Sequence, residues 1–165
     1  SDSERILQLI KKRGRETKTV ELKQTFYYDI ETKTSNKVVQ TSTMKVICSF
    51  LNTIGGILLI GVADNGEITG MNQEVNKLNK SSFDRFKTTF GQILGSRIGK
   101  EFENLIDYEF ITMSAKNHVF EITCSPIPKG GNGCFLDGKD FYVRRNPYTE
   151  ILKDKDLADY YVNRF

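Results

Sequence analysis

The sequence has no tryptophan, one histidine and only three cysteines among its 165 residues. A structural zinc site needs four Cys or His ligands, so this composition argues against one. Any catalytic triad with a histidine base would have to use His118, and no other feature of the sequence points to that residue. The cysteines, Cys48, Cys124 and Cys134, are odd in number and show no C-x-x-C spacing. We therefore expect reduced thiols in a cytoplasmic protein.

Long apolar runs are also missing. The longest, Ile57–Ile60, is far shorter than the roughly 20 residues that cross a bilayer, and the first residues lack the apolar core of a signal peptide. No membrane partner is expected. The length predicts a single domain over residues 1–165, which is compatible with a domain excised from a longer protein. The net charge of +3 permits a polyanionic partner without requiring one.

A nucleotide-binding P-loop is absent from the sequence. The nearest string, Gly95–Lys100, is one residue short and is followed by Glu101 instead of Ser or Thr. The loop Gly130–Gly133 can cradle a phosphate or simply connect a hairpin, and we favour the hairpin. Gly55 and Gly56 fit a left-handed helix cap before a buried strand. An ATP-binding regulatory domain that uses the Gly130–Gly133 loop or the Gly55-Gly56 turn stays an alternative, but ATP is not expected as a cofactor.

Hydrophobic periodicity predicts helices interleaved with hairpins. Helices are predicted at Ser3–Arg13, Ser42–Asn52, Ser82–Leu94 (with Ser81 or Ser82 as the cap) and Lys155–Arg164. Strands are predicted at Thr19–Phe26, Ile57–Val62, Ile106–Met113, Val119–Cys124 and Phe141–Val143, with an exposed loop at Asp29–Lys37. This order does not repeat βαβ units. It predicts an α+β fold, a mixed β-sheet with hairpins flanked by about four helices.

Three acidic residues are candidate metal ligands: Glu16, Glu21 and Asp64. Glu21 occupies a polar position of an alternating strand, so its side chain should leave the core face. Glu16 can converge with it only if the chain bends at Thr17–Thr19. Asp64 follows the end of a buried strand. Three carboxylates suit a hard cation such as Mg²⁺ or Mn²⁺. The alternative is that Asp64 forms a turn and Glu21 is a solvated strand residue.

The basic residues fall into separate groups that are candidates for phosphate contacts. The groups are Lys11, Lys12, Arg13 and Arg15; Lys23; and Arg144 with Arg145. Because Arg144 and Arg145 are neighbours on a predicted strand, we expect at most one of them to face a given ligand. A solvated surface of mixed charge is the alternative.

Three stretches of the sequence resemble the Schlafen AlbA-like family. Glu16–Lys23, ETKTVELK, is similar to the family's E-x-x-x-x-E-F-K. Phe50–Gly70, FLNTIGGILLIGVADNGEITG, is the most specific and is similar to A-F-A-N-T-x-G-G-x-L-L-I-G-V-x-D-x-G-x-I-x-G. Phe141–Leu152, FYVRRNPYTEIL, is the third. The tripeptide 146–148, Asn-Pro-Tyr, departs from the family's G-N-S or G-S.

This resemblance implies a nucleic-acid-binding domain, for DNA or RNA, with a regulatory role. The family was formerly called divergent AAA. In some Schlafen members a three-carboxylate site cuts tRNA or rRNA with a divalent metal, and Glu16, Glu21 and Asp64 fall on those positions, with Lys23 on the neighbouring basic one. The resemblance thus also implies an alternative, a Mg²⁺- or Mn²⁺-dependent endoribonuclease acting on structured RNA. Schlafen cores pair two such lobes across a basic groove, which implies a homodimer of this chain.

Overall fold

The computed structural model describes residues 1–12, 17–80, 82–146 and 148–165, and the side chains of all of these except residues 12, 79 and 115. Its helices are α1 (Asp2–Lys12), α2 (Lys37–Asn52), α3 (Asn72–Asn79), α4 (Phe83–Leu94) and α5 (Asp154–Arg164), with short turns η1 (Gly95–Gly99), η2 (Lys100–Leu105) and η3 (Ser114–Lys116). Its strands are β1 (Val20–Lys23), β2 (Tyr28–Asp29), β3 (Thr34–Ser35), β4 (Gly56–Ile60), β5 (Ile106–Thr112), β6 (His118–Cys124), β7 (Phe135–Leu136), β8 (Asp140–Arg144) and β9 (Thr149–Leu152). Among the described residues, none of the helices has the length and apolar character that a membrane span requires.

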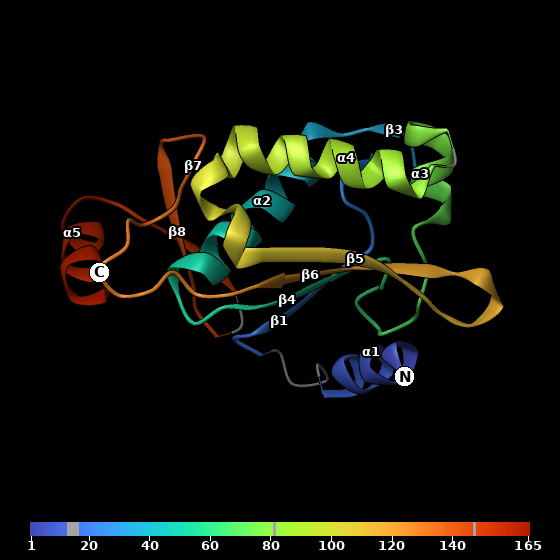
Figure 1. Cartoon of the computed structure of the whole chain (residues 1–165), viewed down its shortest axis with the longest axis horizontal. Coiled ribbons are helices and arrows are strands. Elements are labelled where there is room, and N and C mark those ends of the chain that lie inside the picture. The colour runs from blue at the N-terminus through green and yellow to red at the C-terminus, as the bar shows by residue number, and fades with distance from the viewer. Residues whose placement is uncertain (13–16, 81, 147) are drawn as a thin grey trace.

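The main sheet has the strand order β1-β4-β6-β5. β1 runs parallel to β4, and the other neighbours are antiparallel. A parallel pair needs a crossover connection, and α2 lies within it. Helices α2 and α4 cover one face of this sheet and α1 covers the other (Figure 1). The predicted α+β fold with a mixed sheet is confirmed.

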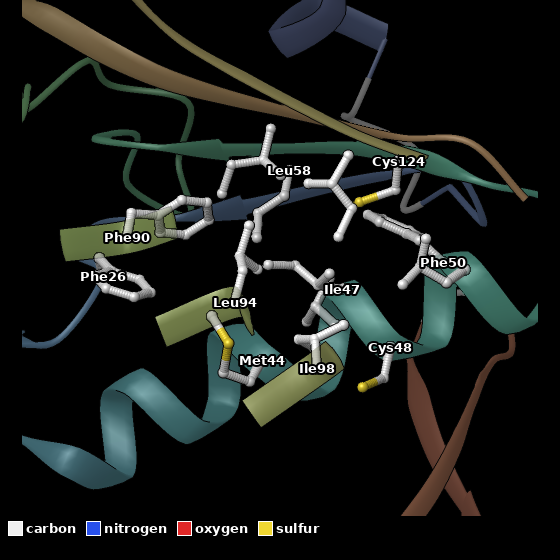
Figure 2. Close-up of a cluster of buried hydrophobic side chains, with 14 of the residues drawn as sticks. Phe26, Met44, Ile47, Cys48, Phe50, Leu58, Phe90, Leu94, Ile98 and Cys124 are labelled. Atoms are coloured by element: carbon white, nitrogen blue, oxygen red, sulfur yellow. The ribbon is translucent and has the colours of Figure 1, made fainter. Parts of the chain in front are cut away.

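The larger core lies between the sheet and the helices α2 and α4. The apolar positions of α2 predicted from the helical period, including Met44 and Ile47, are fully buried. Figure 2 shows these side chains with Leu94 of α4 beneath the strand that carries Leu58. Strand β4 lies inside the sheet, so both of its faces are buried. Leu58 belongs to this core, and Leu59 belongs to the core under α1. Both predictions, the helix stripe and the central strand, are confirmed.

The second face of the sheet is covered by α1. Ile6 is fully buried there. Arg5 binds the carboxylate of Glu121 with both terminal nitrogens, one of them at 2.8 Å from Oε1. Glu121 belongs to β6 and is nearly buried, so this pair fixes α1 to the middle of the sheet.

A smaller sheet, β7-β8-β9, packs with α5 at one end of the molecule (Figure 1). Asn52, at the end of α2, fastens this unit to the larger core. Its Nδ2 donates to the carbonyls of Cys134 and Tyr142, and its Oδ1 accepts from the amide of Cys134, each at 2.9 Å. The thiols of Cys48 and Cys134 lie 3.4 Å apart in the same region. All three cysteines are free and buried, in line with the expected reduced thiols.

Some elements differ from the sequence predictions. Helix α2 begins five residues earlier than predicted, because Oδ1 of Asn36 accepts from the amides of Val38 and Val39 and caps it there. The predicted loop 29–37 contains the small hairpin β2–β3. The sequence analysis also missed α3 and β9, which are short and carry few apolar residues.

Strand β1 ends at Lys23 and does not extend to Phe26 as predicted, since the chain there turns toward α3. Glu74 of α3 causes this turn. Its two carboxylate oxygens accept from the amides of Phe26 (2.9 Å) and Tyr27 (2.8 Å), and the residue is only 2% exposed. Burial raises the pKa of Glu74 to about 7, although the two amide donors favour its charged form.

This raised pKa predicts how stability depends on pH. A carboxyl group whose pKa is higher in the folded than in the unfolded state stabilises the fold below its unfolded pKa, and the effect is lost as the pH rises through the folded pKa. From pH 5 to pH 8 we expect Glu74 to lower the free energy of unfolding by roughly 2–3 kcal/mol. Urea denaturation followed by circular dichroism at several pH values measures this change.

The variant Glu74→Gln has no titratable group at this position and should show a flatter pH profile. Glu103 is exposed, so Glu103→Gln is the matched control and should keep the wild-type profile. Parallel profiles for the wild type and Glu74→Gln would contradict the assignment.

Candidate nucleic-acid and metal site

The chain bends sharply just before β1. Thr17 and Val20 form an antiparallel bridge across a tight turn. This is the bend that the sequence analysis required at Thr17–Thr19 for Glu16 and Glu21 to converge. Glu16 itself lies outside the described residues, as do Arg13 and Arg15 and the side chain of Lys12, so their predicted roles stay predictions.

Pairing of β1 with β4 brings the ends of two sequence motifs to one edge of the sheet. In the parallel register, Lys23 lies opposite Ile60. The carbonyl of Lys23 accepts from the amides of Gly61 (2.8 Å) and Val62 (3.1 Å), which begin the segment leading to Asp64. The end of β1 is therefore fastened to the start of the turn that carries this aspartate.

Lys23 is the centre of the charged groups at this edge. Its Nζ donates to Oγ of Ser42 on α2 at 2.8 Å. Burial lowers the pKa of Lys23, the carboxylates of Glu21 and Asp64 raise it, and the guanidinium of Arg144 lowers it further. Glu21 and Asp64 thus both lie close enough to act on the same ammonium group, and the structure brings these three predicted site residues together.

An open cavity of about 560 Å³ lies beside Lys23. Its lining includes Asp64, Asp29 at the end of β2 and Glu31 in the turn that follows, so carboxylates outnumber lysines on the wall. Carboxylate oxygens are suitable ligands for a hard divalent cation. Within the described ranges, however, no group of three acidic, His or Cys side chains has the arrangement to hold a metal, so a three-carboxylate site would depend on Glu16.

Arg144 is buried, whereas the sequence analysis predicted it at the surface. The sequence analysis assigned it to nucleic-acid contact, but the residue is 2% exposed and its Nη1 donates to Oε1 of Glu21 at 2.9 Å. Every residue of β8 from Phe141 to Arg144 is buried, so both faces of this strand point into packed structure. A phosphate cannot reach a side chain so enclosed. The apolar residues directly before Arg144 were the signal that could have indicated its burial.

Arg145, the next residue, is exposed and forms an ion pair with Glu150 at 3.0 Å. Of these two arginines Arg145 is exposed and Arg144 is not, because Arg145 follows the last residue of β8. Lys11 is exposed near the end of α1. The preceding residue, Ile10, lies against Gly66, where an added Cβ would come within 3.3 Å of its Cγ2. The basic end of α1 therefore lies near the turn that carries Asp64.

The glycine segments are used for packing. Gly55 has a φ of +79°, and a Cβ there would lie 2.6 Å from the carbonyl oxygen of Cys124. This supports the helix-cap interpretation that the sequence favoured. In the loop Gly130–Gly133, the amide of Gly131 donates to the carbonyl of Pro128 and that of Gly133 to the hydroxyl of Tyr161. These two amides are not available to a phosphate group.

Comparison with known families gives a match over most of the chain. A family model described as "Schlafen, AlbA_2" matches residues 16–153. The matched region runs from the turn before β1 to just after β9, and it leaves α1 and α5 outside. No curated protein matches the chain.

Among solved structures, the chain is similar to the DIP2311 protein from Corynebacterium diphtheriae. The TM-score is 0.59 at 14% sequence identity, so the likeness concerns the fold alone. The alignment covers 98% of this chain and 29% of that chain. The chain thus spans less than a third of the structure it matches.

Proposed function

Because the chain belongs to the Schlafen AlbA_2 family, we propose that it is a nucleic-acid-binding module with a regulatory role. The family match over residues 16–153 carries this proposal. The surface that would bind is the edge formed by the ends of β1 and β4, where Lys23 lies. Lys11 on α1 and the exposed Arg145 would add phosphate contacts around it.

Binding to phosphates predicts a strong dependence on salt, because each cationic contact releases a counterion. Fluorescence anisotropy with labelled DNA and RNA at several salt concentrations measures the slope of log affinity against log salt. The variant Lys23→Gln removes the charge and can still hydrogen-bond Ser42, so we expect weaker binding and a slope reduced by about 1.

The matched control is Lys155→Gln, since Lys155 is exposed on α5 and forms an ion pair with Asp159 of the same helix. Its affinity and slope should equal those of the wild type. Binding that is insensitive to salt, or no binding to either DNA or RNA, would reject the proposed module.

A second candidate function is a metal-dependent endoribonuclease. The observation that favours it is that Asp64 lines the cavity beside Lys23, while Glu21 leaves the same face of β1 as Lys23. Glu16, Glu21 and Asp64 would hold Mg²⁺ or Mn²⁺, which when bound supplies a Lewis acid at the scissile phosphate. Arg144 would keep the Glu21 carboxylate in place, and the Lys23 ammonium would stabilise negative charge that develops on the phosphate.

The nuclease candidate predicts that Asp64→Ala loses Mn²⁺-dependent cleavage of structured RNA by on the order of 100-fold or more, while RNA binding changes little. Gel assays with and without Mn²⁺ measure cleavage, and anisotropy measures binding. Asp107→Ala is the control, because Asp107 is exposed on β5. Cleavage that persists in Asp64→Ala would show that these residues have been assigned wrongly.

Assembly as a homodimer also belongs to the proposal. A single lobe provides one wall of a groove, and a second copy related by a two-fold axis would provide the other. Light scattering coupled to size-exclusion chromatography should give twice the mass of one chain at high micromolar concentration. A monomer under those conditions would contradict the two-lobed arrangement.

A further inference from the structure

The buried guanidinium of Arg144 joins the site to the rest of the domain. Its Nη1 donates to the Glu21 carboxylate at 2.9 Å and to the hydroxyl of Thr149 at 3.4 Å. Its Nη2 donates to the carbonyls of Thr17 (3.2 Å) and Val20 (3.4 Å). These carbonyls belong to the two residues that close the turn before β1. One side chain therefore spans that turn and also holds the first acidic residue after it.

Arg144 is itself held by the end of α2. Its amide donates to the hydroxyl of Thr53 at 3.0 Å, and the same hydroxyl donates to the carbonyl of Ser49. The guanidinium lies 5.3 Å from the ring centre of Phe50. Arg164 of α5 donates to the carbonyl of Thr53 at 3.0 Å. The position of the guanidinium is thus set by α2 and α5 together.

Stability alone gives a weak reason for an arginine here. Its Nε is buried and has no hydrogen-bond partner. An unsatisfied buried donor destabilises a fold, and a buried ion pair often contributes less than apolar residues of similar volume would. What an apolar residue could not provide is a planar group that binds two carbonyls and a carboxylate at the same time.

The charge of Arg144 also matters for Lys23. Glu21 and Lys23 are two residues apart on β1, so their side chains leave the same face of the strand. Without the guanidinium, the full negative charge of Glu21 would lie beside Lys23 and would repel an approaching phosphate. With it, the pair is close to neutral.

We propose that Arg144 is a positioning residue, which fixes the turn at 17–20 and the Glu21 carboxylate and cancels the charge of Glu21 next to Lys23. The part that concerns Lys23 rests on the proposed nucleic-acid binding. The part that concerns the turn does not depend on it, so two experiments separate them.

Hydrogen exchange tests the turn. Two variants are compared with the wild type: Arg144→Gln, and Arg144→Lys, which keeps the charge but lacks the planar guanidinium. In both, the amides at 18–21 should exchange about tenfold faster, while the amides of β4 keep their protection. Arg145→Gln, the exposed neighbour, is the control and should leave both regions unchanged. Unchanged exchange at 18–21 in both Arg144 variants would overturn the positioning role, whether or not the protein binds nucleic acid.

RNA affinity tests the charge. Arg144→Gln should weaken binding about tenfold, and the double variant Glu21→Gln/Arg144→Gln should bind within about twofold of the wild type, because the uncompensated carboxylate is gone. Arg144→Lys should stay close to the wild type. Affinities are compared at a temperature where circular dichroism shows each variant folded, and if Arg144→Gln does not fold, Arg144→Lys provides the comparison.

A merely structural role predicts a different pattern, in which the double variant binds as weakly as Arg144→Gln, or Arg144→Lys loses binding despite its charge. Either result would overturn the charge-cancelling role. If the wild type binds neither RNA nor DNA, the proposed function fails and the charge-cancelling role fails with it. Hydrogen exchange still decides whether Arg144 holds the turn.

Discussion

Parallel pairing of β1 with β4 is the constraint on which the site depends. The two strands are far apart in sequence, and α2 fills the connection between them. Their register sets Lys23 opposite Ile60, so the end of β1 meets the segment that leads to Asp64. A register shifted by one residue would send Glu21 and Lys23 to the face covered by α1. Leu22 of β1 opposes such a shift, since it would leave the core under α1.

The charged groups at this edge form a balanced set. The carboxylates of Glu21 and Asp64 both raise the pKa of the partly buried Lys23, and Glu21 is already paired with Arg144. Glu74 adds a further constraint from α3, because it fixes the backbone directly after β1 and so shapes the segment that lines the cavity. The site lies where helices and strands end. The side chains that hold it come from three helices and from the smaller sheet.

Much of this could be predicted from local patterns. The apolar stripe around Ile47, the apolar run of β4 and the turn at Asp64 can each be predicted from a few neighbouring residues. The sequence analysis named a bend at Thr17–Thr19 as the condition for Glu16 to meet Glu21, and the bridge between Thr17 and Val20 provides such a bend. The partners of Arg144 could not be predicted in this way, because Glu21 and Thr17 are more than a hundred residues away in sequence. Glu74 was missed for a different reason, since its partners are backbone amides, which no side-chain pattern reveals.

The long separation between Glu21 and Arg144, 123 residues, has a consequence for how the domain is made. A ribosome releases the N-terminal half first, so β1, α2 and β4 leave the exit tunnel well before the smaller sheet has been translated. During that interval Glu21 lacks its ion pair with Arg144, so the edge that carries Lys23 has one positive charge fewer than in the finished domain. Under the proposed function, the unfinished chain would bind RNA more weakly than the completed domain does.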